Sequence, residues 1–382
     1  MYELSPEHEA FRGVVREFAE AEIAPHVAQW DRDHHLPTKV VLQMGELGLF
    51  GLTAPEEYGG SAADFTSLCV AIEEIGRIDQ SIGATLEAAT GLGINPILTF
   101  GTDEQKNTWL PDLVSGHALA AFGLTEPEAG SDAGATRTRA TLDDGMWVIN
   151  GAKAFITNSG TDITSVITVT ARTGADEIST IMIPAGTPGL TVEPAYDKLG
   201  WHISDTHGLS FDDCRVPEAN LLGVRGNGFR QFLHVLDDGR IAISALAVGL
   251  AQGCLDVSRK YALERHTFGA PIGSRQSVAF SLSDLATQVE AARLLTYRAA
   301  ALKDAGRPDA EIKQAASMAK LFSSDVAMTA ARTATQVFGG NGFMEEFPVA
   351  RFYRDAKILE IGEGTSEVQR MVIARGLGLP VS

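Results

Sequence analysis

The chain is poor in cysteine, which limits the thiol and metal chemistry that it can support. Its 382 residues include three cysteines, Cys69, Cys214 and Cys254, which are far apart and form no CxxC pair. A zinc site or a redox-active thiol pair is therefore not indicated. We interpret the three side chains as buried apolar thiols in a reducing compartment.

Basic residues are scarce relative to acidic ones, and long apolar runs are missing. The chain has 31 Lys and Arg against 49 Asp and Glu, a formal net charge of −18. This sign argues against nucleic acid and anionic membrane surfaces as partners, although a local basic patch for an anionic ligand is compatible with it. The stretch "IAISALAVGLAQGCL" (241–255) is too short and too polar to span a bilayer. The N-terminal segment "MYELSPEHEAFRG" lacks the apolar core of a secretory signal, so we expect a cytoplasmic protein.

Several familiar site motifs are also absent. No GxGxxG follows a strand and opens a helix, and the "GGNGF" at 339–343 follows a helix instead. Walker A, HExxH and GxSxG sequences do not occur. The histidine pairs His34–His35 and His202/His207 have no partners at metal-ligand spacing, so we predict no metal site. A Rossmann site, a P-loop and the common hydrolase sites are not supported.

The chain does contain a change in the spacing of its apolar residues along its length. Residues 1–120 show helical apolar spacing, with Ser5 and Pro6 as a cap and first-turn pair. Residues 121–225 show short β-favouring runs separated by Gly and Pro, which predicts a compact antiparallel β domain. The dipeptide Asn150–Gly151 indicates a hairpin turn there.

The helical period returns in residues 226–382. A helix of nearly forty residues is followed by two more, expected at about 275–304 and 308–337. Asp309 is the expected cap of the third, which ends at Gly339–Gly340. A last helix follows Gly364, which makes an up-down four-helix bundle. The whole is an α+β multidomain chain: an N-terminal helical domain, a middle antiparallel β domain and a C-terminal four-helix bundle.

Two stretches combine small, hydroxylated and acidic residues. In "AFGLTEPEAGSDAGATRTRA" (121–140), Thr125 and Pro127 fit a helix start, but Ser131 and its glycine neighbours also fit a lining for a polar heterocycle or an anion. In "KILEIGEGTSEVQRMVIAR" (357–375), Glu363 stands between two glycines, between ordered segments. Taken alone, it is a solvated glutamate on a flexible turn.

Five stretches together resemble one family. "FGLTEPEAGSD" resembles the first signature of the acyl-CoA dehydrogenases, and "QVFGGNGFMEEFPVARFYRDAKILEIGEGTSEVQR" resembles the second. "WVINGAKAFITNSG", "LDDGRIAISALAVGLAQGCLD" and "ERHTFGAPIGSRQ" match in type and order. The resemblance runs over essentially the whole chain and implies the acyl-CoA dehydrogenase fold, which agrees with the helix–β–helix order.

The resemblance also implies an FAD enzyme, usually a homotetramer, whose flavin lies partly across a subunit interface. It assigns contacts with the isoalloxazine ring to Phe122, Leu124, Thr125, Phe155 and Thr157, with Ser131 at the junction of flavin and substrate. Phe155 stands where many relatives carry tryptophan. Contacts with the rest of FAD fall to Arg265, Thr267, Phe268, Gln276, Gln336 and Gly340, and Thr365 and Glu367 would face the cofactor. Without the resemblance, Arg265 is an ordinary solvated arginine at a helix end.

The reaction that the resemblance implies is α,β-dehydrogenation of an acyl-CoA to a trans-2-enoyl-CoA, with electron-transfer flavoprotein as acceptor. Glu363 is assigned as the base, with a pKa raised by desolvation, and its backbone N–H helps to bind the thioester oxygen. Some relatives carry the base just before an arginine on a bundle helix, but here that position is Gly239. Substrate contacts are assigned to Ser131, Asp237, Arg240, Gly362 and Gly364, although Asp237 and Arg240 also fit the first turn of a helix.

Only local features of the sequence narrow the range of possible acyl-CoA substrates. Many medium-chain relatives have a bulky aromatic residue where this chain has Gly362, and the motifs look most like the short-chain and branched short-chain group. Butyryl-, isobutyryl- or 2-methylbutyryl-CoA is therefore expected, although a missing side chain also deepens a pocket. The alternatives are an acyl-CoA oxidase, another flavoenzyme of this fold, a dehydrogenase of carrier-protein-bound acyl groups, or a flavin-binding protein without catalysis.

Overall fold

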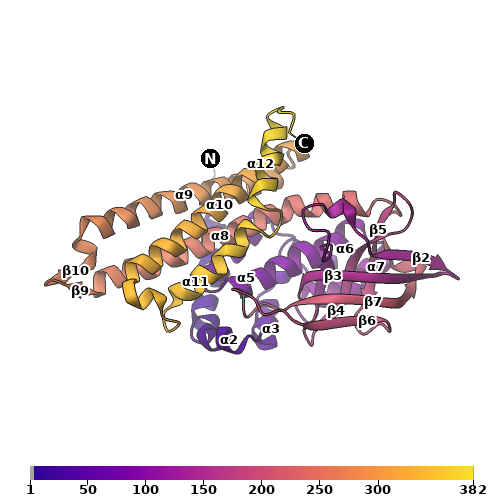
Figure 1. Cartoon of the computed structure of the whole chain (residues 1–382), viewed down its shortest axis with the longest axis horizontal. Helices are drawn as coiled ribbons and strands as arrows, with labels where there is room; N and C mark the ends of the chain where they lie inside the picture. Colours follow the sequence, from indigo (N-terminus) through magenta and orange to yellow (C-terminus); the bar gives the residue numbers. More distant parts are fainter. Residues whose placement is uncertain (1–3, 382) are drawn as a thin grey trace.

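The computed structural model describes residues 4–381, and these fold in the expected order of helices, sheet and helices. In Figure 1 the long C-terminal helices form one half of an elongated molecule and the sheet forms the other, with N-terminal helices beneath and between them. The predicted fold class is confirmed.

The N-terminal part is entirely helical. Ser5 accepts a hydrogen bond from the backbone N–H of His8 and the His8 ring accepts one from the backbone N–H of Ser5, so the predicted cap is present as a capping box. The α-helices here are α1 (Pro6–Phe18), α2 (Val27–Asp33), α3 (Thr38–Glu46), α4 (Phe65–Ile78), α5 (Gln80–Glu87), α6 (Asn95–Phe100) and α7 (Asp103–Val114).

The middle part is one eight-stranded sheet with the order β6-β7-β3-β2-β4-β5-β8, and β1 also pairs with β4. Its strands are β1 (Leu119–Gly123), β2 (Arg139–Asp143), β3 (Met146–Thr157), β4 (Thr164–Arg172), β5 (Ile178–Pro184), β6 (Leu190–Ala195), β7 (Thr206–Pro217) and β8 (Leu221–Leu222). The prediction of a purely antiparallel sheet is wrong in two places, because β4 runs parallel to both β1 and β2.

The predicted hairpin turn at Asn150–Gly151 is also wrong. These residues lie inside β3, where the register with β7 is irregular. The turn between β2 and β3 is made instead by Asp144 and Gly145, with φ of 47° and 74°. At Gly151 a β-carbon would lie 2.7 Å from the Cα of Thr138, so glycine is required by close packing.

The C-terminal part is built on three long helices and a short fourth. They are α8 (Gly228–Glu264), α9 (Gln276–Asp304), α10 (Asp309–Phe338) and α12 (Ser366–Gly376), with α11 (Pro348–Ala356) and the short hairpin β9 (His266–Thr267) and β10 (Ala270–Pro271) between them. Pro308, and not Asp309, is the N-cap of α10; Asp309 lies in its first turn. Among the described residues, α8 is the one helix long and apolar enough to cross a membrane, and 78% of its apolar window is buried in the fold.

Two apolar cores hold these parts together. The larger combines the N-terminal helices with α8, α9 and α10, and the smaller fills the sheet around Trp147 and Ile149. Strand β4 contributes to both, because Val166 points to the helical core and Ile167 to the sheet core. The sheet is thereby fixed against the helices.

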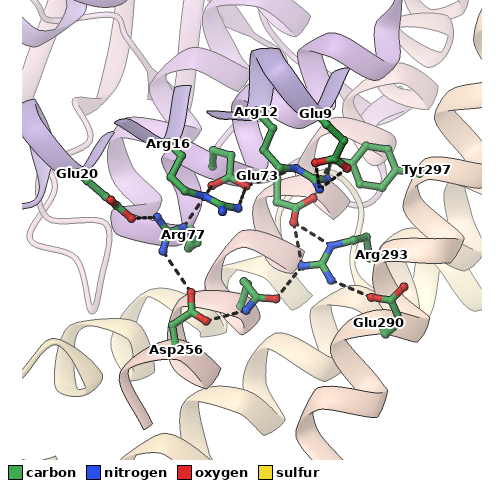
Figure 2. Close-up of polar contacts among 12 residues, drawn as sticks. Glu9, Arg12, Arg16, Glu20, Glu73, Arg77, Asp256, Glu290, Arg293 and Tyr297 are labelled. Carbon is green, nitrogen blue, oxygen red and sulfur yellow. Dashed lines mark hydrogen bonds and ion pairs between the residues drawn. The ribbon is translucent and has the colours of Figure 1, made fainter. Parts of the chain in front are cut away.

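Buried ion pairs add polar links between the N-terminal helices and the bundle (Figure 2). Glu73 and Glu74 on α4 are 2% and 1% exposed. Glu73 accepts from Arg293 and from the Tyr297 hydroxyl on α9, at 2.9 and 2.7 Å. Glu74 accepts two hydrogen bonds from Arg16 of α1. Each buried carboxylate therefore has cationic partners, without which its burial would be costly.

Candidate active site

Glu363 lies on a glycine-flanked loop between α11 and α12, and its backbone has the left-handed conformation. Its φ is 54°, which a non-glycine residue adopts only at a cost. Its Oε2 atom is buried and accepts no hydrogen bond from the described residues. A β-carbon on Gly239 of α8 would lie 2.6 Å from this oxygen. The carboxyl group therefore occupies the space that the missing side chain at position 239 leaves open.

Burial raises the pKa of Glu363 to about 7, and the charges of Arg240 and Lys320 only partly oppose this shift. A carboxyl group that titrates near neutrality can take a proton from a weak carbon acid and release it again. Desolvation is the dominant cause, as a base in this role requires.

The loop is held from below by two buried side chains. Lys320 of α10 donates from Nζ to the carbonyl of Gly364 at 2.8 Å. Gln369 of α12 donates to the same carbonyl at 2.8 Å and to that of Glu363 at 3.2 Å. Thr365 accepts from the backbone N–H of Val368 and caps α12. Fixed carbonyls on both sides keep the strained residue in place.

A second acid stands near Glu363. Glu87, at the end of α5, is 4% exposed, and its Oε1 has no hydrogen-bond partner among the described residues. Burial and then the charge of Glu363 raise its pKa well above the ordinary glutamate value. The enclosed space around Glu363 therefore disfavours further negative charge.

The 122–125 segment and the end of β3 lie side by side. The backbone N–H of Ala154 donates to the carbonyl of Thr125 at 2.8 Å. Phe155 has a φ of 63° and is 65% exposed, with its ring 5.1 Å from that of Tyr196. Thr157 ends the strand, half-buried. An exposed aromatic ring and two half-buried threonines thus belong to two neighbouring segments, which can accept a planar polar ring.

The rest of this segment is anchored inward. Phe122 stacks on Phe232 of α8, with ring centroids 5.7 Å apart. Leu124 is half-buried, and Ser131 is exposed on the loop that follows. The alternative reading of Thr125 as a helix cap is wrong, because Glu126 and Ala129 form a tight two-bond turn and no helix begins there.

A buried ion pair fixes the same segment to the sheet. Lys153, 1% exposed, donates to Glu126 at 2.7 Å and to the carbonyl of Leu124 at 3.1 Å. Burial alone would raise the pKa of Glu126, but Lys153, Thr136 and the Arg137 N–H outweigh it and hold that pKa at about 2. Burial lowers the pKa of Lys153 to about 8 against the attraction of Glu126. This pair determines where Thr125 is presented.

Asp237 and Arg240 form an ion pair on α8, with Nη1 and Oδ1 2.6 Å apart. Arg240 is 4% exposed, and its charge acts on Glu363. The reading of these residues as the first turn of a helix is wrong, because α8 begins at Gly228. Gly362 is beside the base, and a β-carbon there would meet only the carbonyl of Ile358, at 3.5 Å. Gly364 has a φ of 89°.

The remaining candidates gather at the opposite end of the molecule. The hairpin β9–β10 lies at the far end of the bundle from the sheet (Figure 1). Phe268, between its strands, is 96% exposed. Asn341 donates to the hydroxyl of Tyr261, which brings the turn after α10 to the end of α8. This end holds Arg265, Thr267, Phe268, Gln276, Gln336 and Gly340, so one chain does not bring them to Glu363.

Known proteins match this chain along its full length. Family models described as the N-terminal, middle and C-terminal domains of acyl-CoA dehydrogenase match residues 5–117, 121–214 and 226–378. A probable acyl-CoA dehydrogenase of Bacillus subtilis is 48% identical over 98% of this chain and 99% of its own length. The chain belongs to the acyl-CoA dehydrogenase family. The short-chain specific enzyme of Rattus norvegicus mitochondria is 45% identical over 97% of this chain and 90% of its own.

The fold agrees with this membership. The structure of butyryl-CoA dehydrogenase from Megasphaera elsdenii matches with a TM-score of 0.94 and 40% identity, over 98% of this chain and 99% of the other. Acyl-CoA dehydrogenases are FAD-dependent oxidoreductases, so the predicted family, activity and cofactor are confirmed. The exposed Phe155 beside Thr125 and Thr157 fits a flavin ring, and the exposed guanidinium of Arg265 fits a diphosphate.

The sequence reasoning missed four buried charged residues of this acyl-CoA dehydrogenase: Glu87, Glu126, Lys153 and Lys320. Glu87 and Lys320 interrupt stretches that are otherwise rich in apolar and small residues. Lys320, for example, lies on the face of α10 that buries Ala316 and Ala327. A lone charge on a core-facing position costs folding energy unless it is used, and that signal was available in the sequence.

Proposed function

We propose that this acyl-CoA dehydrogenase oxidises a short-chain or branched short-chain acyl-CoA to the trans-2-enoyl-CoA, with Glu363 as the base. The observation that supports this assignment best is the buried, unpartnered Oε2 of Glu363 and its pKa of about 7. Position 239, where some relatives carry the base, is glycine and lies against this carboxyl group. Of the two positions at which members of the family carry the base, 363 and 239, position 363 is therefore the one that holds an acid in this chain.

In this mechanism the residues of the chain have separate roles. Glu363 takes the α-proton, and its backbone N–H donates to the thioester oxygen as negative charge develops there. The chemistry that bound FAD would supply is acceptance of the β-hydrogen with its electron pair. Thr125 and Thr157 would donate to the polar edge of the flavin ring, and Phe155 would cover one face. Ser131, Asp237 and Arg240 would orient the substrate, and Thr365 and Glu367 would lie toward the cofactor.

A short acyl chain is supported by the functions of two relatives and by local chemistry. They act as a short-chain specific enzyme and a butyryl-CoA dehydrogenase. Glu87 near the base disfavours an acyl group with its own carboxylate. Gly362 leaves open space beside the base, which suits a branch at the α- or β-carbon.

We also propose a cytoplasmic homotetramer that passes its electrons to an electron-transfer flavoprotein. The placement of Arg265 and Phe268 far from Glu363 supports a second copy, because one FAD is expected to contact both groups. The domain limits 1–120, 121–225 and 226–382 remain our proposal for the units of the chain.

The test is anaerobic bleaching of the flavin by a panel of straight and branched acyl-CoAs. Glu363→Gln is expected to retain FAD and bind acyl-CoA but to lose nearly all bleaching, while Glu311→Gln, a surface acid paired with Arg307, behaves as the wild type. Bleaching at the wild-type rate in Glu363→Gln would exclude Glu363 as the base. Fast reoxidation by air would favour an oxidase, and a preference for acyl-carrier protein would change the substrate class.

A further inference from the structure

Lys320 is a buried lysine with no anionic partner in the described chain. It is 1% exposed, in the middle of α10, and no carboxylate of the described residues lies within ion-pair distance of its Nζ. Among the residues that the structure describes, its Nζ donates a hydrogen bond to the carbonyl of Gly364, at 2.8 Å. An ammonium group in such a place costs several kcal/mol of free energy unless its charge is used.

Packing gives no reason for a charge at this position. The neighbouring buried residues of α10 are small, among them Ala316, Ser317, Ser323 and Ser324. An unbranched apolar side chain such as methionine would fill the same path without the desolvation penalty. The direction of the lysine, toward the loop of Glu363, is therefore the informative feature.

We propose that Lys320 is a positioning residue for the base: it holds the Gly364 carbonyl, keeps Glu363 over Gly239 in its left-handed conformation, and stabilises the carboxylate form. This inference rests on the proposed role of Glu363. It assigns to a residue on a different helix the task of keeping the catalytic loop in its reactive geometry.

The charges around Glu363 explain why Lys320 is the important counter-charge. Arg240 faces Glu363 from α8, but it is already paired with Asp237 at 2.6 Å. Glu87, from α5, adds a like charge when ionised. Lys320 faces Glu363 from α10 with its charge less compensated.

The charges around Lys320 itself also favour its role as the counter-charge of Glu363. Glu363, Glu360 and Asp325 attract the ammonium and Arg240 repels it, while burial is the largest influence and lowers the pKa of Lys320 to about 8. Lys320 is thus still largely protonated at the pH where Glu363 titrates. A neutral side chain there would leave Glu363 with one partly neutralised cation.

Three substitutions in the holoenzyme separate charge from hydrogen bonding. Lys320→Met removes both, Lys320→Gln keeps one donor without charge, and Lys320→Arg keeps both. The measurement is the anaerobic rate of flavin bleaching by butyryl-CoA across pH, together with FAD content. Lys39→Met, an exposed lysine on α3, is the matched control.

We expect the acid limb of the profile to move upward by about one pH unit in Lys320→Met and Lys320→Gln, which is about tenfold in rate on that limb. Lys320→Met is expected to lose plateau rate as well, because the loop carbonyl is released. Lys320→Arg and Lys39→Met are expected to keep the wild-type limb.

Two results would overturn the proposal. One is a wild-type limb and plateau in both neutral variants with full FAD content. The other is loss of folding in both neutral variants while Lys320→Arg folds, which would make the lysine a requirement of the bundle alone. If Glu363→Gln bleaches normally, the proposed base fails instead, and this outcome is separate because it does not involve Lys320.

Discussion

Replacing Glu363 by glutamine should stabilise the protein, and more so at alkaline pH. The folded chain raises the pKa of this carboxyl group from 4.5 to about 7, so the folded state binds a proton more tightly than the unfolded state. Stability from this group is therefore present below about pH 4.5 and is lost as the pH rises to about 7. Above that pH the wild-type protein carries the whole cost of a buried carboxylate, which glutamine does not have.

The magnitude follows from the shift. A pKa that rises from 4.5 to about 7 corresponds to about 3 kcal/mol at pH 8, of which about 1 kcal/mol is already lost at pH 5.5. The difference between the two conditions is about 2 kcal/mol. With an unfolding entropy of about 0.8 kcal/mol/K for a chain of this size, it amounts to about 2–3 °C in Tm. Both conditions lie above the sequence pI of about 4.9, where the net charge keeps the protein in solution.

The assay compares the Tm of Glu363→Gln and wild-type holoenzyme at pH 5.5 and pH 8, by thermal denaturation followed through flavin fluorescence. Any pH-independent effect of the amide cancels in the difference between the two pH values. Glu311→Gln, at the surface, should show no such trend. An equal Tm difference at both pH values would refute the reasoning, since it would mean that Glu363 does not titrate at a raised pKa.

Three further changes test other parts of the structure. Gly239→Ala places a methyl group 2.6 Å from Oε2 of Glu363, and displacement of the base should slow flavin bleaching by about tenfold or more at unchanged FAD content. Lys153→Met leaves its buried carboxylate partner without a cation, which should cost about 3–5 kcal/mol and lower FAD retention on dialysis. Tyr297→Phe removes one hydrogen bond to Glu73, which should cost about 1–2 kcal/mol in thermal denaturation and leave the bleaching rate unchanged.

Sequence periodicity was enough for the order of helices and strands because apolar residues recur at helical spacing in the two outer parts of the chain, whereas short β-favouring runs between Gly and Pro fill the middle part. The long helices were expected at about 275–304 and 308–337 and are found at Gln276–Asp304 and Asp309–Phe338. The hairpin prediction failed because Asn150–Gly151 has the right dipeptide, but close packing against Thr138 decides its conformation. Asp144–Gly145, two residues of the same kind, makes the turn.

The candidate site also has a part that the sequence predicted and a part that it did not. Motifs identified Glu363 and Thr125, because each lies in a short segment with its neighbours. They did not identify Lys320 or Glu87. A lone charge in a core-facing stretch marks each of these as unusual, but its proximity to the Glu363 loop, across 43 or more positions of sequence, is not encoded in any local pattern. Nor does a single chain bring Arg265 to the same place, which is why we propose that a second copy of the chain completes the FAD site.

The two loops that carry the proposed chemistry share one design. Lys153 on β3 donates to the carbonyl of Leu124 and ties the 122–125 segment to the sheet, and Lys320 on α10 donates to the carbonyl of Gly364 and ties the loop of Glu363, whose φ is positive. In both cases the ammonium donates to a backbone carbonyl, so the loop is held without a bulky contact on its exposed side. A strained backbone persists only if its surroundings fix it. Burying a lysine behind each segment meets that need and leaves the other side free for the flavin and thioester that we propose to bind there.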